Sequence, residues 1–328
     1  MFDGAPSDQS APRFSLLNGE GSGAMLAAAV GDVAGGASPV GYSAITQQAT
    51  VVAYHLLRND GIDRPSLTED WLELAAEGGS VGVYRSPSPE FESFLKAAQD
   101  GEATASAEPS AEPAARIHPV GVWFRRHPDR LVESATAAAR LTHTDATSVL
   151  GAVAMAGAVA ASCFAQAGGD LLRAAAEVGE RCLAAITAEE FLFSRVADAR
   201  SWLQSLHRVA QRDWMSAAEV ADDLAARGGS SAVDRPLLAM IIAAPVGGEP
   251  YRQVEQAAAL GGTELATMVG AIVGARVGLR SWPWVVPNDT WFAEIGRRLV
   301  NGNRETRDIP VPHHVEERLT FGGQRDLM

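Results

Sequence analysis

Lysine and cysteine are the scarcest residues in this chain of 328 residues. Lys96 is the only lysine, and arginine supplies the other cations. A phosphate-binding P-loop needs a Gly-Lys-Ser/Thr triplet, and Lys96 lies between Leu95 and Ala97, so nucleotide triphosphate hydrolysis through such a loop is excluded. The two cysteines, Cys163 and Cys182, form no Cys-x-x-Cys pair, which excludes a zinc ribbon and a disulfide framework.

Cations are also outnumbered by anions. The chain carries 27 Lys and Arg against 40 Asp and Glu, a formal charge of −13. Because nucleic acids and anionic membrane surfaces attract clustered cations, this balance predicts that neither is a partner. Residues 1–15 contain no basic stretch followed by an apolar one, so we expect no signal peptide and a cytoplasmic location.

Large hydrophobic residues are sparse in one uncharged run that is long enough to cross a bilayer. No charged residue occurs between Ala146 and Gly169. Alanine, glycine and serine dominate the run, and alanine gains little free energy on transfer from water. Small residues also let helices approach closely. The run therefore predicts a central buried helix in a soluble all-helical core, with a membrane span as the less favoured alternative.

Apolar residues recur at helical spacing along nearly the whole chain. The predicted helices cover residues 21–33, 46–57, 66–77, 128–140, 146–169, 171–186, 191–212, 216–227, 236–244, 251–259, 264–277 and 290–300. Alternating patterns typical of strands are limited to 81–84 and 120–123. Hydrophobic residues make up 47% of the chain, enough for a large core. The predicted fold class is therefore all-α, a single compact multi-helix domain.

Two segments lack helical spacing. Residues 100–115 are acidic, low in complexity and contain proline, which predicts a mobile loop, and residues 302–328 form a polar tail. We expect a flexible N-terminus over residues 1–20 and one domain over residues 21–301. His313, His314 and Glu316 are metal-ligating residue types, but their place in a polar tail favours a solvated segment.

Four segments, taken in order, carry a family signal. They read Gly-Ala-Met-Leu-Ala-Ala-Ala-Val-Gly-Asp-Val-Ala-Gly at 23–35, Tyr-Ser-Ala-Ile-Thr-Gln at 42–47, Arg-Ile-His-Pro-Val-Gly at 116–121 with Leu-Thr-His-Thr-Asp at 141–145, and Leu-Gly-Gly-Thr-Glu-Leu-Ala-Thr-Met-Val-Gly-Ala at 260–271. From about residue 21 to residue 300 the chain resembles the ADP-ribosylglycohydrolase family, which includes dinitrogenase-reductase-activating glycohydrolases and J1 crystallins. The resemblance implies a compact all-helical domain whose dinuclear magnesium site cleaves ADP-ribose from proteins or small molecules.

The chain departs from the family at the first metal-binding motif. The family motif Tyr-Thr-Asp-Asp-Thr-Gln corresponds to residues 42–47, and the resemblance assigns metal binding to both of its aspartates. In this chain Ser43 replaces the first threonine, and Ala44 and Ile45 replace the aspartates, while Thr46 is retained. The preceding loop, residues 36–41, carries no acid.

The second metal-binding motif is also incomplete. The family sequence Gly-Gly-Asp-x-Asp-Thr corresponds to the segment that opens with Gly261 and Gly262. One register places Thr263 and Leu265 at the aspartate positions, and the other places Thr263 and Glu264 at the final Asp-Thr. At most one carboxylate remains in either register. Because two neighbouring magnesium ions need several carboxylates to offset their mutual repulsion, the sequence predicts no dinuclear magnesium centre and no metal cofactor.

Three residues are candidate catalytic groups if the chain works without metal: Asp32, Glu264 and His143. Asp32 ends an apolar helix, so its alternative role is to accept hydrogen bonds from backbone amides as a helix cap does. His143 matches a family Leu-Thr-His segment, and its alternative role is to pack beside Thr144 or Asp145, one of which is expected to cap the long buried helix.

A remnant of the family's ligand cleft is the other predicted feature. Arg116 matches a family arginine that faces the cleft, where it could hold a phosphate through two hydrogen bonds, and a structural salt bridge is an equal alternative. Backbone amides at Gly261 and Gly262 could meet an anion at a helix start. The remnant site is predicted to comprise six residues: Ser43, Thr46, Arg116, Gly261, Gly262 and Thr263.

The loss of both aspartate pairs leads to one leading functional hypothesis and two alternatives. The leading hypothesis is a pseudoenzyme that keeps the family fold and works as a binding or scaffolding protein, with another protein as partner, because apolar Ile45 is expected to fill part of the cleft. The first alternative is an active ADP-ribosyl hydrolase with a non-standard site. The second is a sensor that binds ADP-ribose or a nucleotide without cleaving it.

Overall fold

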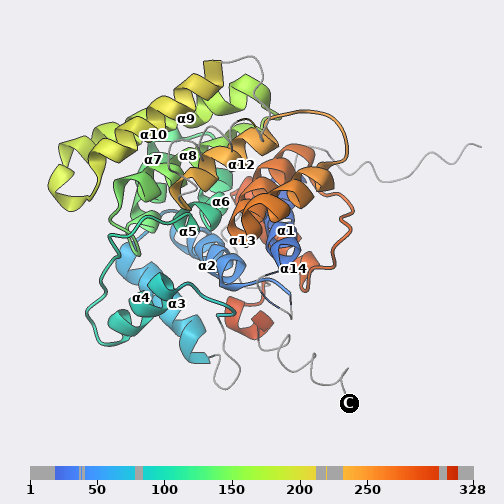
Figure 1. The fold of residues 1–328 in the computed structure, drawn as a ribbon. Helices are drawn as coiled ribbons and strands as arrows, with labels where there is room; N and C mark the ends of the chain where they lie inside the picture. The colour runs from blue at the N-terminus through green and yellow to red at the C-terminus, as the bar shows by residue number, and fades with distance from the viewer. Residues whose placement is uncertain are drawn as a thin grey trace, which may run out of the picture.

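The computed structural model describes residues 19–36, 38, 41–77, 84–211, 219, 232–302 and 309–316. These residues form helices joined by short connections, and they contain isolated bridges but no strand. The elements, shown in Figure 1, are α1 (Gly19–Gly35), α2 (Ala44–Asn59), α3 (Arg64–Glu77), α4 (Pro89–Gln99), α5 (Glu112–Ala115), α6 (His118–Trp123), α7 (Pro128–Ala139), α8 (Ala146–Ser162), α9 (Gly168–Ala188), the 3₁₀ turn η2 (Glu190–Leu192), α10 (Val196–Gln211), the 3₁₀ turn η3 (Ala232–Asp234), α12 (Arg235–Ala243), α13 (Pro250–Val277) and α14 (Asp289–Asn301). The prediction of an all-α single domain is confirmed.

Helix α8 is the buried centre of one half of the fold. Every one of its residues is buried, and it packs against α5, α6, α7, α9, α10, α12 and α13. Asp145 caps it, because the Asp145 Oδ1 atom accepts the Ser148 N–H at 2.7 Å. Figure 1 shows α9 and α10 running side by side along one edge of the molecule. The predicted central buried helix is confirmed, although it ends at Ser162, short of the predicted residue 169.

Among the described helices, α13 is the one long and apolar enough to cross a membrane, and α8 is too short. The most apolar 18 residues of α13 are 61% buried inside the structure. Helix α13 packs against α1, which is what the core helix of an all-helical domain does.

Glycine sets the distance between α1 and its two neighbours, α13 and α14. A Cβ atom on Gly270 would lie 2.0 Å from the Ala27 carbonyl oxygen, and one on Gly274 would lie 2.1 Å from the Gly23 carbonyl oxygen. On the other side of α1, a Cβ atom on Gly296 would lie 2.1 Å from the Gly21 carbonyl oxygen. Since no side chain fits at these distances, the three backbones touch directly. Gly21 and Gly23 are therefore buried packing positions.

The break predicted between helices 251–259 and 264–277 is a kink within one element. Gly262 has φ 65° and ψ −151°, a backbone conformation that side-chain-bearing residues rarely adopt. The kink lets the second half of α13 run along α1. The six-residue remnant site predicted from the sequence includes Gly262, whose conformation explains why glycine is needed there.

Several sequence-based boundaries are wrong. Residues 120–123, a suggested strand, lie in helix α6, where Pro119 occupies the first turn. The helix predicted to start at residue 66 starts at Arg64, and Asp63 accepts the Ser66 N–H at 2.9 Å. The stretch predicted as a helix from residue 191 contains a 3₁₀ turn and an extended residue before α10 begins at Val196. The suggested strand residues 81–83 and nearly all of the predicted helix 216–227 lie outside the described residues.

Two segments predicted to be solvent-exposed are partly buried. Residues 112–115 form α5, all of it buried, so this end of the predicted loop is a packed helix, while the mobility of residues 100–110 stays a prediction. In the tail, Ile309, Val315 and Glu316 are buried. Figure 1 shows this segment as a short helical turn below α2. The expectation that the tail around His313 is fully solvated is therefore wrong for residues 309–316.

Candidate functional site

Asp32 holds the start of α2 against the end of α1. The side chain is fully buried, and its Oδ2 atom accepts the backbone N–H groups of Ser43 (2.9 Å) and Thr46 (3.2 Å). The same oxygen accepts the Ser43 hydroxyl at 3.0 Å and the Thr46 hydroxyl at 2.6 Å. Burial raises the pKa of Asp32, and these four hydrogen bonds oppose the rise. The predicted alternative role, capping of backbone amides, is the one that the geometry supports.

The kink of α13 meets the same end of α1. A Cβ atom on Gly35 would lie 2.3 Å from the Thr263 Cα atom, and one on Gly31 would lie 2.1 Å from the Ala266 carbonyl oxygen. The glycines of α1 therefore bring the segment 261–267 next to the residues that Asp32 holds. The structure thus places Asp32, Ser43, Thr46 and Thr263 in one region, as the family resemblance implies.

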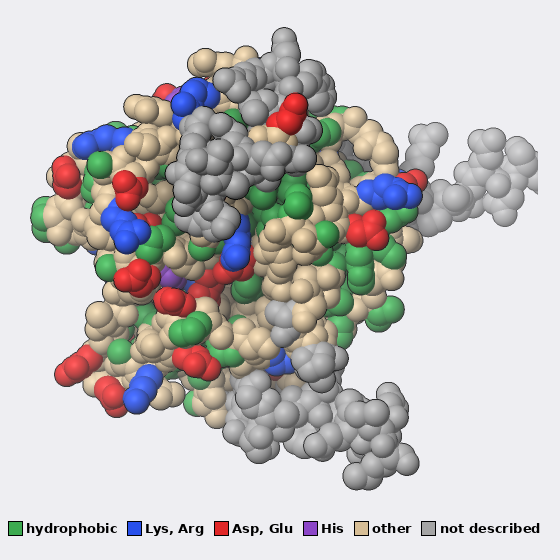
Figure 2. Space-filling view, in the orientation of Figure 1, with side chains coloured by type: hydrophobic (Ala, Val, Ile, Leu, Met, Phe, Trp, Pro, Cys, Tyr) green, Lys and Arg blue, Asp and Glu red, His purple; other side chains and the backbone are tan. Residues whose placement is uncertain are grey.

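Glu264 is paired with an arginine that sequence reasoning missed. Its carboxylate contacts the Arg235 guanidinium at the start of α12, and the two side chains are 20% and 39% exposed. Burial raises the pKa of Glu264, the Arg235 charge lowers it, and the negative charges of Glu112 and Glu90 raise it further. Figure 2 shows acidic and basic side chains together in the hollow in the middle of one face of the molecule. Arg235 opens a helix rich in leucine and isoleucine, and nothing in that pattern signals its partner.

The two residues at the family's first aspartate pair have structural roles. Ala44 is buried, and its backbone N–H donates to the Arg85 carbonyl oxygen at 2.6 Å. Ile45 is half-buried and packs against the hydrophobic core. Neither side chain offers an oxygen, so this turn of α2 presents hydrocarbon where the family presents carboxylates.

Arg116 lies in a buried polar network instead of facing the cleft. Its guanidinium is 3.6 Å from the Glu112 carboxylate one helical turn away, and it donates to the Gln48 side-chain oxygen at 2.8 Å. The guanidinium also lies over the Trp71 ring, 5.1 Å from its centroid. Burial lowers the pKa of Arg116 to about 10, and Glu112 opposes that shift. Of the two roles predicted for Arg116, the geometry supports the structural salt bridge. The low-complexity sequence around Glu112 gave no signal that this acid is buried.

His143 borders the same network. Its Nδ1 atom lies 2.9 Å from the Thr142 hydroxyl, which also accepts a hydrogen bond from Arg116. Burial lowers the pKa of His143 to about 3, and the Arg116 charge lowers it further. The imidazole is therefore neutral at physiological pH. Asp145 caps α8 through one carboxylate oxygen, as predicted for Thr144 or Asp145.

These donors do not fit a pair of magnesium ions. Magnesium takes oxygen ligands, mostly carboxylates and water, and two adjacent dications need a strongly negative donor set. The Ser43 hydroxyl is bonded to Asp32, and Thr263 is neutral and packs against Gly35. The carboxylate of Glu264 already faces the positive charge of Arg235, which would repel a dication. Among the described residues, no group of three or more His, Cys, Asp or Glu is placed to hold a metal ion.

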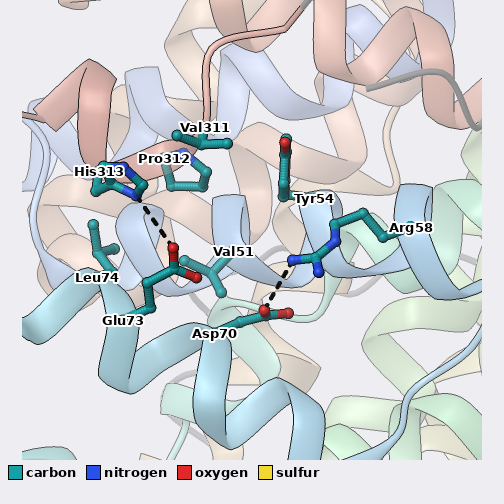
Figure 3. A pocket seen from close by; sticks show the side chains of 9 residues that line it. All are labelled: Val51, Tyr54, Arg58, Asp70, Glu73, Leu74, Val311, Pro312 and His313. Atoms are coloured by element: carbon teal, nitrogen blue, oxygen red, sulfur yellow. Dashed lines mark hydrogen bonds and ion pairs between the residues drawn. The ribbon is translucent and has the colours of Figure 1, made fainter. Parts of the chain in front are cut away.

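A separate polar pocket of about 170 Å³ lies between α2, α3 and residues 311–313 (Figure 3). Its charged side chains are paired with one another. Asp70 accepts from Arg58 at 3.2 Å and lies 2.6 Å from the buried His55, and His313 lies 3.8 Å from Glu73. The contacts of Asp70 join α2 to α3, and the His313–Glu73 contact joins the C-terminal segment to α3. None of the predicted site residues lines this pocket.

Comparison with known proteins agrees with the all-helical fold described above. A family model, ADP-ribosylglycohydrolase, matches residues 20–308. The chain belongs to the ADP-ribosylglycohydrolase family. A solved structure titled "ADP-ribosylglycohydrolase-related protein complex" is similar to it, with a TM-score of 0.60, 18% sequence identity, and coverage of 88% of this chain and 99% of that one. At that identity the likeness concerns the fold. No curated protein sequence matches the chain.

Proposed function

We propose that this member of the ADP-ribosylglycohydrolase family does not hydrolyse ADP-ribosyl bonds and acts by binding, with another protein as its partner. The observation that supports this most is the state of the residues at the family's metal positions. Ala44 and Ile45 are packed as hydrocarbon, Thr263 is neutral, and Glu264 is tied to Arg235. The remaining carboxylate, Asp32, is fully buried, so this region lacks the accessible metal pair or unpaired carboxylate that would polarise the ribose and activate water.

The alternative of a metal-independent hydrolase has less support. None of the three candidate catalytic groups is both accessible and unpaired. Asp32 accepts four hydrogen bonds through one oxygen, Glu264 is ion-paired, and His143 is fully buried. A general base needs to reach substrate or water, and a fully buried imidazole does not.

The alternative of an ADP-ribose sensor is also less favoured. Its phosphate-binding group would be Arg116, which is 1% exposed and bound to Glu112, Gln48 and Thr142. Freeing Arg116 for a phosphate would leave the Glu112 carboxylate buried without its cation, which is costly.

Turnover and ligand binding test the proposal together. Full-length protein is incubated with an ADP-ribosylated protein and magnesium, beside an active family member, and ADP-ribose is titrated by calorimetry with and without magnesium. We expect no release of ADP-ribose and a flat calorimetric trace. Turnover by the wild type that is lost in Glu264→Ala, in a variant that keeps the wild-type urea midpoint, would establish the hydrolase. Micromolar binding of ADP-ribose that chelator does not affect would establish the sensor.

Partner capture tests the protein-binding part. Ile45→Asp places a charge on the half-buried surface at the family's metal positions, and Val246→Asp places one at a residue that is 76% exposed, next to the Pro245 carbonyl that Arg276 contacts. A partner that uses the cleft should be captured by the wild type and by Val246→Asp but lost with Ile45→Asp. Equal capture by all three chains would contradict binding at the cleft.

A further inference from the structure

A second cavity, larger than the pocket beside α3, lies at the opposite end of α1 from Asp32. It has a volume of about 860 Å³ and is lined by the start of α1, the residues that follow α8, the end of α13 and Arg297 of α14. At 1.5 Å per residue, Gly19 and Asp32 are about 20 Å apart along the helix. This pocket therefore shares nothing with the family's metal site, and the proposal that follows does not depend on the proposed function.

The walls of the pocket are apolar and solvent-accessible. Phe164, after α8, is 46% exposed, and Leu279, after α13, is 52% exposed. Ala275 and Val277 extend this surface along α13. Large hydrophobic side chains that stay exposed together around a concavity are typical of ligand-binding sites.

The edge of the pocket is basic, in contrast to the acidic chain as a whole. Arg276, Arg280 and Arg297 line it, and the Arg126 guanidinium lies 5.4 Å from the centroid of the Phe164 ring. Among the described residues that line it, Glu20 is the one acid. A net positive edge on a protein of charge −13 favours an anionic ligand.

The arginines differ in what they can offer to a ligand. Arg297 is bound to Glu294 at 2.6 Å, so its charge is largely compensated. Arg276 donates to the carbonyl oxygens of Ala243 (2.6 Å) and Pro245 (3.1 Å), neutral groups that fix the guanidinium without cancelling its charge. Arg280 is exposed at the end of the α13 segment. The pocket thus has one guanidinium held in place, that of Arg276, and one exposed guanidinium, that of Arg280, beside an apolar wall.

We propose that this pocket binds a small amphipathic anion, with an apolar body against Phe164 and Leu279 and a carboxylate or phosphate head near Arg276 and Arg280. The volume lies within the range of roughly 300–1,000 Å³ that is common for small-molecule sites. A guanidinium that faces an oxyanion can form two parallel charge-assisted hydrogen bonds. The start of α1 adds backbone N–H groups whose dipoles also favour negative charge.

Three probes with the same ten-carbon chain test the proposal on the full-length protein by calorimetry. Decanoate and decyl phosphate carry the anionic head, and decyltrimethylammonium carries the opposite charge. We expect both anions to bind with a 1:1 stoichiometry and the cation to bind at least about tenfold more weakly. The ratio of decanoate to decyl phosphate affinity identifies which head group the site prefers.

Matched variants place the binding in this pocket. Arg280→Ala is expected to weaken decanoate binding at least about fivefold, and Arg200→Ala, at an exposed arginine on α10, is expected to leave it unchanged. Leu279→Asp is expected to abolish binding, and Leu260→Asp, the same change at a residue that is 50% exposed in the first half of α13, is expected to have no effect.

Three results would overturn the proposal. The first is the absence of binding of either anion to the full-length chain. The second is equal affinity for the anions and the cation, or an affinity that Arg280→Ala does not change. The third is a wild-type dimer in sedimentation that Leu279→Asp converts to a monomer, because the pocket would then be filled by a second copy.

Discussion

The side chains around the two ends of α1 differ in how many hydrogen bonds and ion pairs they form with the rest of the protein. At the end near Asp32, polar groups are bonded to each other, as in the Glu112–Arg116 pair and the Glu264–Arg235 pair. At the end near Gly19, apolar side chains and the Arg280 guanidinium face solvent around a cavity. At the end that carries chemistry in the family most charged groups are thus paired inside the protein, although the Asp32 Oδ1 and His143 Nε2 atoms are buried without a hydrogen-bond partner, while the other end exposes apolar and cationic side chains around a cavity.

This difference teaches that residues in a family's motif positions can serve the packing of the fold. The motif positions of this chain still serve the fold: Asp32 holds α2, and Gly31 and Gly35 let α13 approach. The family residues kept at these positions are therefore explained by helix packing. Only the residues at the two aspartate pairs bear on whether a metal ion can bind.

The largest expected loss of stability comes from a substitution that forces α13 away from α1. Gly270→Ala would place a Cβ atom 2.0 Å from the Ala27 carbonyl oxygen, so α1 and α13 would have to separate. We expect a loss of about 3 kcal/mol or more in the free energy of unfolding, measured by urea denaturation. Gly61→Ala is the control, because the nearest atom to its Cβ would be Arg130 at 3.9 Å. A loss of less than 1 kcal/mol in Gly270→Ala would contradict the close contact.

Removal of the Asp32 carboxylate tests the Asp32 end of α1 directly. Asp32→Ala leaves the N–H groups and hydroxyls of Ser43 and Thr46 without their acceptor, and we expect a loss of about 3 kcal/mol in urea denaturation. Asp32→Asn retains one acceptor oxygen and is expected to cost less. If Asp32→Ala unfolds at the wild-type urea concentration, Asp32 does not hold α2 in the way described.

Acid sensitivity tests the buried histidines on the same side of the molecule. Burial lowers the pKa of His143 to about 3 and that of His118 to about 4. The unfolded chain binds protons at about pH 6.5 and the folded chain does not, so stability is present above pH 6.5 and is lost as the pH falls toward those folded-state values. We expect each histidine to remove about 2 kcal/mol of stability between pH 7 and pH 5. His143→Gln should reduce this loss in urea titrations at the two pH values, and an unchanged loss would show that His143 titrates normally.

The smallest effect is expected at the pocket end. Leu279→Asp replaces a side chain that is already 52% exposed, so the free energy of unfolding should change by less than about 0.5 kcal/mol. Thermal unfolding of the variant beside the wild type measures this. A loss of 2 kcal/mol or more would mean that Leu279 is covered in solution and that the two ends are more alike than the structure shows.

The fold could be predicted from the sequence because helical spacing and alanine-rich runs persist over most of the chain. The buried helix at Ala146 and the helix break at Gly262 follow from charge-free composition and from glycine. The helix of residues 112–115 and the docked tail could not be predicted, since their burial depends on distant partners. Glu316, for example, is buried by an ion pair with Arg85 and a hydrogen bond from Tyr42.

The candidate site was predictable only in part. The family motifs indicate which residues gather at the end of α1, and the structure brings Asp32, Ser43, Thr46 and Thr263 together. The partners that neutralise the remaining charges lie far along the chain in segments without a motif. Arg235 is an example, since only the folded chain brings it to Glu264.

A crystal of the full-length protein soaked in manganese, a dication that binds oxygen donors as magnesium does, tests the central claim most directly through its anomalous signal. The account predicts no cation beside Ser43 and Thr263 and an intact contact between Glu264 and Arg235. Two cations a few ångströms apart at that place, with Arg235 displaced, would contradict it.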